Sequence, residues 1–187
     1  NDKAAGQMNL FGESDAAPAV EIPIPDVPEY GKSSILEWEK EFLGFYISGH
    51  PLDRFRDIRR KFDAAGIDLF SYVMTIGDDF TDPEIEAVFR HMQALEVTRY
   101  CTNQTRIGMG RRMVPYAEKY WISPPFHTHS LVNDPNEIAS PASPDAVLAM
   151  SPLFMVNLDI GHFARGGNEP FAYLKAHHDR ITHLHVR

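Results

Sequence analysis

The runs FMVNLDI at residues 154–160 and ITHLHVR at residues 181–187 decide the fold. Both are rich in β-branched and large apolar residues, and a helical pattern, EPFAYLKAHHDR at 169–180, separates them. Three more strand-like runs, at 67–76, 97–103 and 122–130, alternate upstream with helical patterns at 58–66, 81–95, 109–120 and 143–151. Because strands that alternate with helices form right-handed βαβ units, we predict an α/β fold with a parallel sheet.

The helix expected at 81–95 has the clearest boundary signals. Thr81 or Asp82 can cap its first turn, Pro83 suits that turn, and apolar residues recur at 85, 88, 89, 92 and 95. This spacing predicts one buried helix face.

Polar side chains gather where three of these strands end. The active sites of parallel α/β barrels form at the carboxyl ends of the strands, and the residues expected there are His127, His129, Asp159, His162, His183 and His185. Alternation along a strand places His127 with His129, and His183 with His185, on one face. Imidazoles and a carboxylate suit a divalent metal such as Mn²⁺, Co²⁺, Zn²⁺ or Mg²⁺.

Other readings of these residues stay open. A lone strand histidine can be a hydrogen-bonded structural residue, whereas an aspartate inside FMVNLDI is costly to bury unless it is paired or bound to a cation. The loop residues Asn103, Gln104 and Arg106 fit either a polar ligand site or a solvated loop. His177 and His178 suit helix capping and the surface.

Composition limits the classes of protein. The chain has 187 residues, which is short for a closed barrel of about 250. Its single cysteine, Cys101, excludes an internal disulfide framework and suits a cytoplasmic location. No apolar run approaches the roughly 18 residues of a membrane span. Residues 1–57 hold 11 acidic against 5 basic side chains, so direct binding to a nucleic-acid backbone is not expected.

The first 57 residues have a different character. The proline-rich, acidic stretch 13–29 predicts a disordered linker within 1–32, and SSILEWEKEFLGFYISGHPL at 33–52 predicts a helix capped by Ser33 or Ser34 and ended by Gly44 or Gly49. The run LGFYISGHPL resembles the segment of bacterial DNA polymerase III alpha subunits that leads into their OB domain. In that family a Q-x-x-L/M-F peptide upstream binds the β sliding clamp, and Gln7, Leu10 and Phe11 match this pattern. The resemblance implies a clamp partner for residues 7–11.

Residues 58–187 resemble the sugar phosphate isomerase/epimerases of the xylose-isomerase-like TIM-barrel superfamily, through TNQT, HTH with DPNE, VNLDIGHF and HHDRITHLHV. The resemblance implies that Asp159 and His185 are the metal ligands on strands six and seven, that His162 contacts substrate oxygen, and that a sugar or sugar phosphate is the ligand. His127 stands where a glutamate is usual, and the glutamate of strand eight has no counterpart. The resemblance therefore implies a partial barrel, about strands three to seven, with a weakly held metal and no isomerase activity alone.

Together these features predict a composite chain. Its expected parts are a linker at 1–32, a polymerase-like helix and turn at 33–57, and a partial TIM barrel at 58–187. A natural fusion, a gene-assembly artefact and a deliberate joining of two genes all fit this sequence. Three alternatives follow: a metal-dependent sugar isomerase or epimerase fragment, a module that binds the sliding clamp, and a composite without function.

Overall fold

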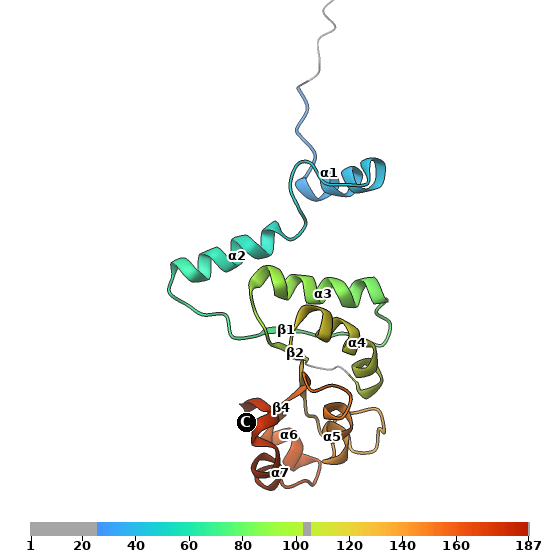
Figure 1. Cartoon of the computed structure of the whole chain (residues 1–187), viewed down its shortest axis with the longest axis vertical. Helices are drawn as coiled ribbons and strands as arrows, with labels where there is room; N and C mark the ends of the chain where they lie inside the picture. Colours follow the sequence, from blue (N-terminus) through green and yellow to red (C-terminus); the bar gives the residue numbers. More distant parts are fainter. Residues whose placement is uncertain (1–25, 103–105, 187) are drawn as a thin grey trace, which may run out of the picture.

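A five-stranded parallel sheet organises the computed structural model, which describes residues 26–102 and 106–186 (Figure 1). Its strands are β1 (Tyr72–Met74), β2 (Tyr100–Thr102), β3 (Pro125–His127), β4 (Met155–Asp159) and β5 (Ile181–His185). They follow one another across the sheet in sequence order, and every adjacent pair is parallel. The predicted parallel α/β fold is confirmed.

Helices make the connections between these strands. They are α3 (Asp82–Leu95), α4 (Ile107–Tyr120), α5 (Ala142–Leu148), α6 (Ile160–Arg165) and α7 (Pro170–His177), with a short 3₁₀ turn, η3, at His178–Arg180. The sequence patterns predicted all of these except α6, which begins directly where β4 ends. A consecutive strand order with helical crossovers is the arrangement of a TIM barrel.

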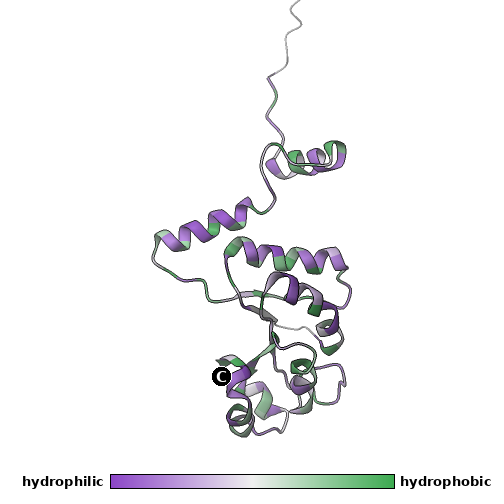
Figure 2. Ribbon diagram, viewed as in Figure 1, coloured by the Kyte–Doolittle hydropathy of each residue, from purple (hydrophilic) through white to green (hydrophobic). Residues whose placement is uncertain are grey.

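The start of α3 is set by local chemistry. Thr81 and Glu84 form a capping box, in which the Glu84 carboxylate accepts a hydrogen bond from the Thr81 N–H at 2.7 Å. The helix buries the stripe that its spacing predicted, and Ile85, Phe89 and Met92 are wholly inaccessible to solvent. Figure 2 shows the resulting amphipathic colouring of α3.

The core lies between the sheet and α3, α4 and α5. Phe126 of β3 and Phe154, just before β4, are both fully buried with their ring centroids 5.1 Å apart. A smaller apolar cluster joins Val156 and Leu158 of β4 to Phe163 and Tyr173. Together the two clusters fix the strand ends that carry the polar residues.

The first helix begins differently from the prediction. Helix α1 (Lys32–Trp38) starts after Gly31 without a side-chain cap, so neither Ser33 nor Ser34 is its N-cap residue. Both serines already lie inside the first turn. A π-helical turn, η2 (Glu39–Leu43), follows and ends at Gly44, whose φ of 79° explains why glycine occupies this position.

Helix α2 (Asp53–Ala64) joins this segment to the sheet domain. It runs through the expected boundary at 57/58 and packs on α3, where the Phe55 ring stacks on His91 with centroids 4.1 Å apart. Arg59 adds a hydrogen bond to the carbonyl oxygen of Leu95. Figure 1 shows α1 standing away from the sheet and α2 beside α3.

The sheet has two edges within the described ranges, because β1 pairs only with β2 and β5 only with β4. Closure of an eight-stranded barrel needs both edges to be paired. Across 26–102 and 106–186, no helix is long and apolar enough to cross a membrane.

Candidate metal centre

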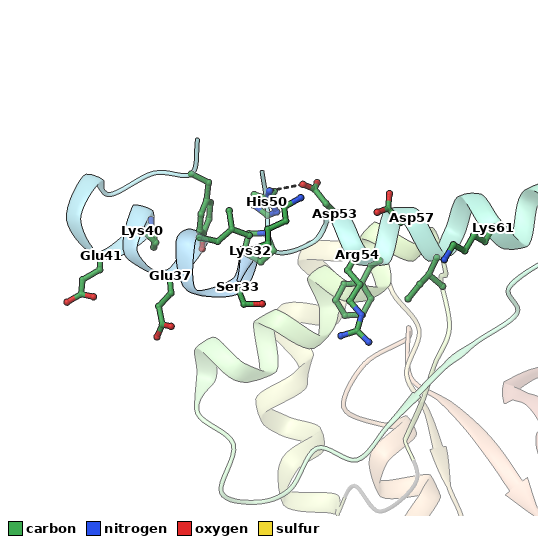
Figure 3. A pocket seen from close by; sticks show the side chains of 15 residues that line it. Lys32, Ser33, Glu37, Lys40, Glu41, His50, Asp53, Arg54, Asp57 and Lys61 are labelled. Atoms are coloured by element: carbon green, nitrogen blue, oxygen red, sulfur yellow. Dashed lines mark hydrogen bonds between the residues drawn. The ribbon is translucent and has the colours of Figure 1, made fainter. Parts of the chain in front are cut away.

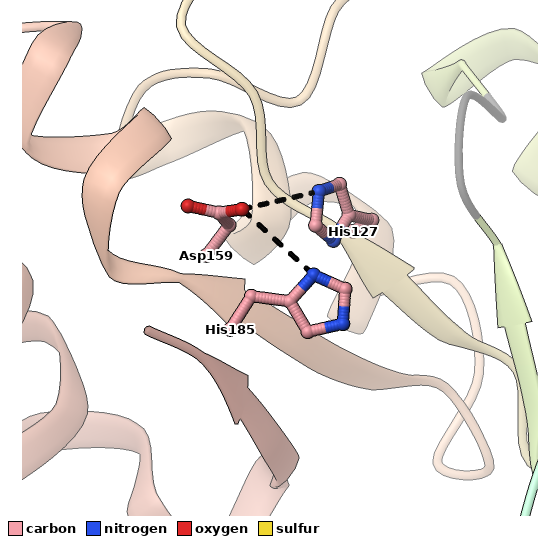
Figure 4. A group of neighbouring side chains, drawn as sticks. All are labelled: His127, Asp159 and His185. Carbon is pink, nitrogen blue, oxygen red and sulfur yellow. Dashed lines mark ion pairs between the residues drawn. The ribbon is translucent and has the colours of Figure 1, made fainter. Parts of the chain in front are cut away.

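Three side chains at the carboxyl ends of neighbouring strands converge on one point (Figure 4). His127 is the last residue of β3, Asp159 the last of β4 and His185 the last of β5. Each offers one nitrogen or oxygen atom, and these three atoms lie within 4.8 Å of one another. The sheet register explains the convergence, because Asp159 pairs directly with His185 and His127 pairs with the residue two before Asp159.

The Asp159 carboxylate is the centre of the group. Its Oδ2 atom lies 3.7 Å from His127 Nε2, 3.8 Å from His185 Nδ1 and 3.9 Å from His162 Nε2. These separations are too long for hydrogen bonds. They are close to the roughly 3.4 Å that separates two ligands of a tetrahedral ion with bonds of about 2.1 Å. A small inward movement of these side chains would therefore let them share one cation.

Backbone and loop contacts hold Asp159 in place. The side chain is wholly buried, and its Oδ1 atom accepts a hydrogen bond from the His162 N–H at 2.8 Å, which caps α6. The Asp159 N–H donates to Thr128 Oγ1 at 2.9 Å. One carboxylate oxygen thus orders the helix that carries His162, while the other faces the imidazoles.

Burial keeps the nearest imidazole neutral. Desolvation, helped by the neighbouring His129 and His185, lowers the pKa of His127 to about 3. A neutral ring has a nitrogen lone pair, which is the form that binds a metal ion. His185 lies at the accessible side of the group, with 40% of its side chain exposed.

His129 lies beside the group and not within it. Strand β3 ends at His127, so the predicted alternation does not reach His129, although the two ring centroids are 5.0 Å apart. Its Nδ1 atom is hydrogen-bonded to the carboxylate of Glu137. Sequence reasoning missed Glu137, whose only signal is an acidic residue in the DPNE run that follows the HTH motif.

The other expected site residues are more scattered. His183 turns to Thr182, whose Oγ1 lies 2.7 Å from its Nδ1, and its ring meets Phe70 edge to face. Arg106 faces Asp78 and Asp134. Asn103 and Gln104, together with the clamp-binding candidates Gln7, Leu10 and Phe11, lie outside the described residues.

A recess lies between α1 and α2 (Figure 3), and none of the three residues of the metal group lines it. It has a volume of about 1100 Å³ and is lined largely by charged side chains, among them Lys32, Glu37 and Lys61. The Asp53 carboxylate accepts from the His50 N–H there at 2.7 Å. The recess contains no cluster of His, Cys, Asp and Glu that could hold a metal within the described part of the chain.

Comparisons with known proteins give two kinds of similarity, one by sequence and one by fold. No protein-family model matches it. By sequence it is similar to DNA polymerase III subunit alpha, with 39% identity over 56 residues for Xylella fastidiosa and 42% over 52 residues for Treponema pallidum. These matches cover 29% and 28% of this chain, and 5% and 4% of those polymerase subunits.

The fold is similar to that of TIM-barrel proteins among solved structures. The probable 3-DHS dehydratase AsbF of Bacillus anthracis has a TM-score of 0.58 at 12% identity, covering 84% of this chain and 68% of that one. A D-psicose 3-epimerase has a TM-score of 0.57 at 10% identity, with 72% and 57% covered. The IOLI protein, solved with a zinc atom, has a TM-score of 0.53 at 15% identity, with 81% and 66% covered. The chain is a composite of a polymerase-like segment and a partial TIM barrel.

Proposed function

We propose that the barrel part of this chain binds one divalent transition-metal ion through His127 Nε2, Asp159 Oδ2 and His185 Nδ1. The single observation that carries this proposal is the approach of three imidazole nitrogens to one buried carboxylate oxygen at 3.7–3.9 Å. His162 supplies the third of these nitrogens and is the candidate for a fourth ligand or a contact to substrate. The zinc atom of the IOLI protein supports the proposal by analogy of fold.

The donor set favours particular metals. Three imidazole nitrogens and one carboxylate oxygen suit Zn²⁺ and Co²⁺, whereas Mg²⁺ and Mn²⁺ prefer sites built mainly from oxygen. The usual glutamate would have added such an oxygen where His127 now stands. We therefore expect Zn²⁺ and Co²⁺ to bind more tightly than Mn²⁺ or Mg²⁺, and all of them weakly because His185 lies at an open sheet edge.

A sugar with a hydroxy-ketone group, or its phosphate, is the proposed ligand class. When bound, the ion would polarise the carbonyl oxygen of such a ligand. The residues of this chain would orient it: His162, with 28% of its side chain exposed, can donate a hydrogen bond to a ligand oxygen, and His129 is held beside it by Glu137. The D-psicose 3-epimerase with a similar fold supports this class, since it was solved in the presence of D-fructose.

Calorimetry of the full chain with Zn²⁺ tests the metal proposal. We expect binding by the unaltered chain and none by Asp159→Ala. Asp68→Ala is the matched control, because this aspartate is exposed in the segment between α2 and β1. Equal heats from Asp159→Ala and from the unaltered chain would remove the proposal.

A second function of a different class rests on the polymerase-like segment. We propose that residues 7–11 bind the β sliding clamp of bacterial replication and that the chain is cytoplasmic. The supporting observation is the sequence similarity to DNA polymerase III subunit alpha. Leu10 and Phe11 would be the buried anchors, and Gln7 would add directional hydrogen bonds.

A further inference from the structure

Asn157 lies at the centre of the imidazole group although neither metal nor substrate chemistry calls for an amide there. It is in the middle of β4, two residues before Asp159, so alternation places both side chains on the same face of the sheet. The residue is wholly buried, and it pairs with His127 of β3 and His183 of β5 in the sheet register.

Its carboxamide touches two rings of the proposed metal centre. The Asn157 Nδ2 atom lies 3.0 Å from His127 Nδ1 and 3.4 Å from His185 Nε2. The opposite nitrogen of each ring faces the Asp159 carboxylate, at 3.7 Å for His127 and 3.8 Å for His185. Each imidazole is therefore held between the amide on one side and the carboxylate on the other.

This arrangement couples the amide to the tautomer of both rings. A neutral imidazole has one nitrogen that donates and one that accepts. With Nδ2 toward the rings, both amide hydrogens are donated, so His127 Nδ1 and His185 Nε2 accept and the nitrogens that face Asp159 carry the protons. A half-turn of the carboxamide would present Oδ1 instead, and the two rings would then donate to it.

We propose that Asn157 is the positioning residue that sets the tautomer of His127 and His185 for metal binding. This inference rests on the proposed metal function. With metal bound, the Oδ1 atom would accept from both rings, and the nitrogens that face Asp159 would offer their lone pairs to the ion. Each neutral ring would carry its one proton on the nitrogen that faces Asn157 instead of the one that faces Asp159, so the change releases no net proton.

Two substitutions of Asn157 distinguish a role in setting the tautomers from a role in filling space. Asn157→Leu keeps the branched shape and removes both hydrogen-bonding atoms, whereas Asn157→Asp presents two acceptor oxygens and loses the donor. If the side chain only fills space, both variants should affect metal binding alike. If it sets the tautomers, Asn157→Asp should hold the rings in the form that binds metal and Asn157→Leu should not.

The measurements are long-range ¹H–¹⁵N spectra of the histidines in the full chain and Zn²⁺ affinity by competition with a coloured chelator. Without metal, we expect protons on His127 Nε2 and His185 Nδ1 in the unaltered chain and on the opposite nitrogens in Asn157→Asp. Zn²⁺ affinity should fall about 10–100-fold in Asn157→Leu and should be kept or increased in Asn157→Asp. Asp68→Ala is the control, because Asp68 is exposed in the segment between α2 and β1 and its loss should change neither readout.

The spectra and the affinities each test the assignment of Asn157 as the residue that sets the two tautomers. Identical histidine tautomers in the unaltered chain and in Asn157→Asp would overturn it, and so would an equal loss of Zn²⁺ affinity in both variants. If the unaltered chain binds no Zn²⁺, the proposed metal function fails. The spectra of the metal-free chain would still show whether Asn157 sets the two tautomers.

Discussion

His129 and Glu137 are joined by a hydrogen bond between the imidazole Nδ1 and the carboxylate Oε1, across the loop that follows β3. The backbone of the same loop is closed by the His129 N–H, which donates to the Ile138 carbonyl at 2.7 Å. Glu137 is buried, so this pair orders a loop that would otherwise have only backbone contacts beside the imidazole group.

Removal of this carboxylate should destabilise the fold. Glu137→Leu removes the partner of the part-buried His129 nitrogen, and such a loss costs about 1–3 kcal/mol. Glu137→Gln should keep part of the stability that Glu137→Leu loses, because the amide oxygen still accepts a hydrogen bond from His129. Urea unfolding gives the free energy of unfolding of each variant. Glu118→Leu is the control at an exposed position, and its free energy of unfolding should lie within about 0.5 kcal/mol of that of the unaltered chain. A Glu137→Leu variant as stable as Glu118→Leu would contradict the structural role.

Glu86 should make stability depend on acid pH. Hydrogen bonds from Lys119 and Tyr120 lower the pKa of Glu86 from its ordinary 4.5 to about 2 in the folded chain. As the pH falls, Glu86 is therefore protonated at a higher pH in the unfolded chain than in the folded chain. Its contribution to stability is complete above about pH 4.5 and is lost as the pH falls toward 2. Melting temperatures measured across this window should fall less steeply for Glu86→Gln than for the unaltered chain. If the melting temperatures of the two proteins fell in parallel with pH, the contacts of Glu86 with Lys119 and Tyr120 would contribute nothing to stability.

Much of this fold was predictable because its signals are local. The capping residue Thr81, the apolar stripe of α3 and the five strand runs each depend on neighbours in sequence, and all have counterparts in the structure. The strand-end rule also placed Asp159 and His185 at the same edge of the sheet, and the sheet register pairs them directly. Periodicity and the strand-end rule were sufficient for these features.

The features that were missed depend on contacts between distant segments. Glu137 lies in a loop without periodicity, and its importance arises only when the chain folds back on His129. Asn157 looks like an ordinary polar residue within a strand until His127 and His185 pack against it. Helix α6, IGHFAR, is too short to show a helical period, and the carboxylate of Asp159 defines its start.

The peptide at residues 7–11 should bind a bacterial β sliding clamp in isolation. Its support is the motif and the polymerase-like sequence that follows. Calorimetry of a peptide spanning residues 4–13 should give measurable heat, and replacing Leu10 and Phe11 with alanine should cost about 2–4 kcal/mol, as the loss of buried anchors commonly does. Alanine at Met8 and Asn9 is the matched control, since the motif leaves these positions variable. Equal heats from the two altered peptides would refute the anchor assignment.

The 187-residue chain by itself should not interconvert ketohexoses, ketopentoses or their phosphates. Proton transfer beside a carbonyl needs a base within hydrogen-bond reach of the carbon acid, and His127, with a pKa of about 3, stands where a carboxylate would serve. Among the described residues β1 and β5 are each paired on one side only, so no described strand lies beyond the His185 end of the centre. Assays of the purified chain with Zn²⁺, Co²⁺ or Mn²⁺ should give no turnover above metal-only controls. Metal-dependent turnover that Asp159→Ala abolishes and Asp68→Ala keeps would show this expectation to be wrong, and would mean that another residue or another chain supplies the base.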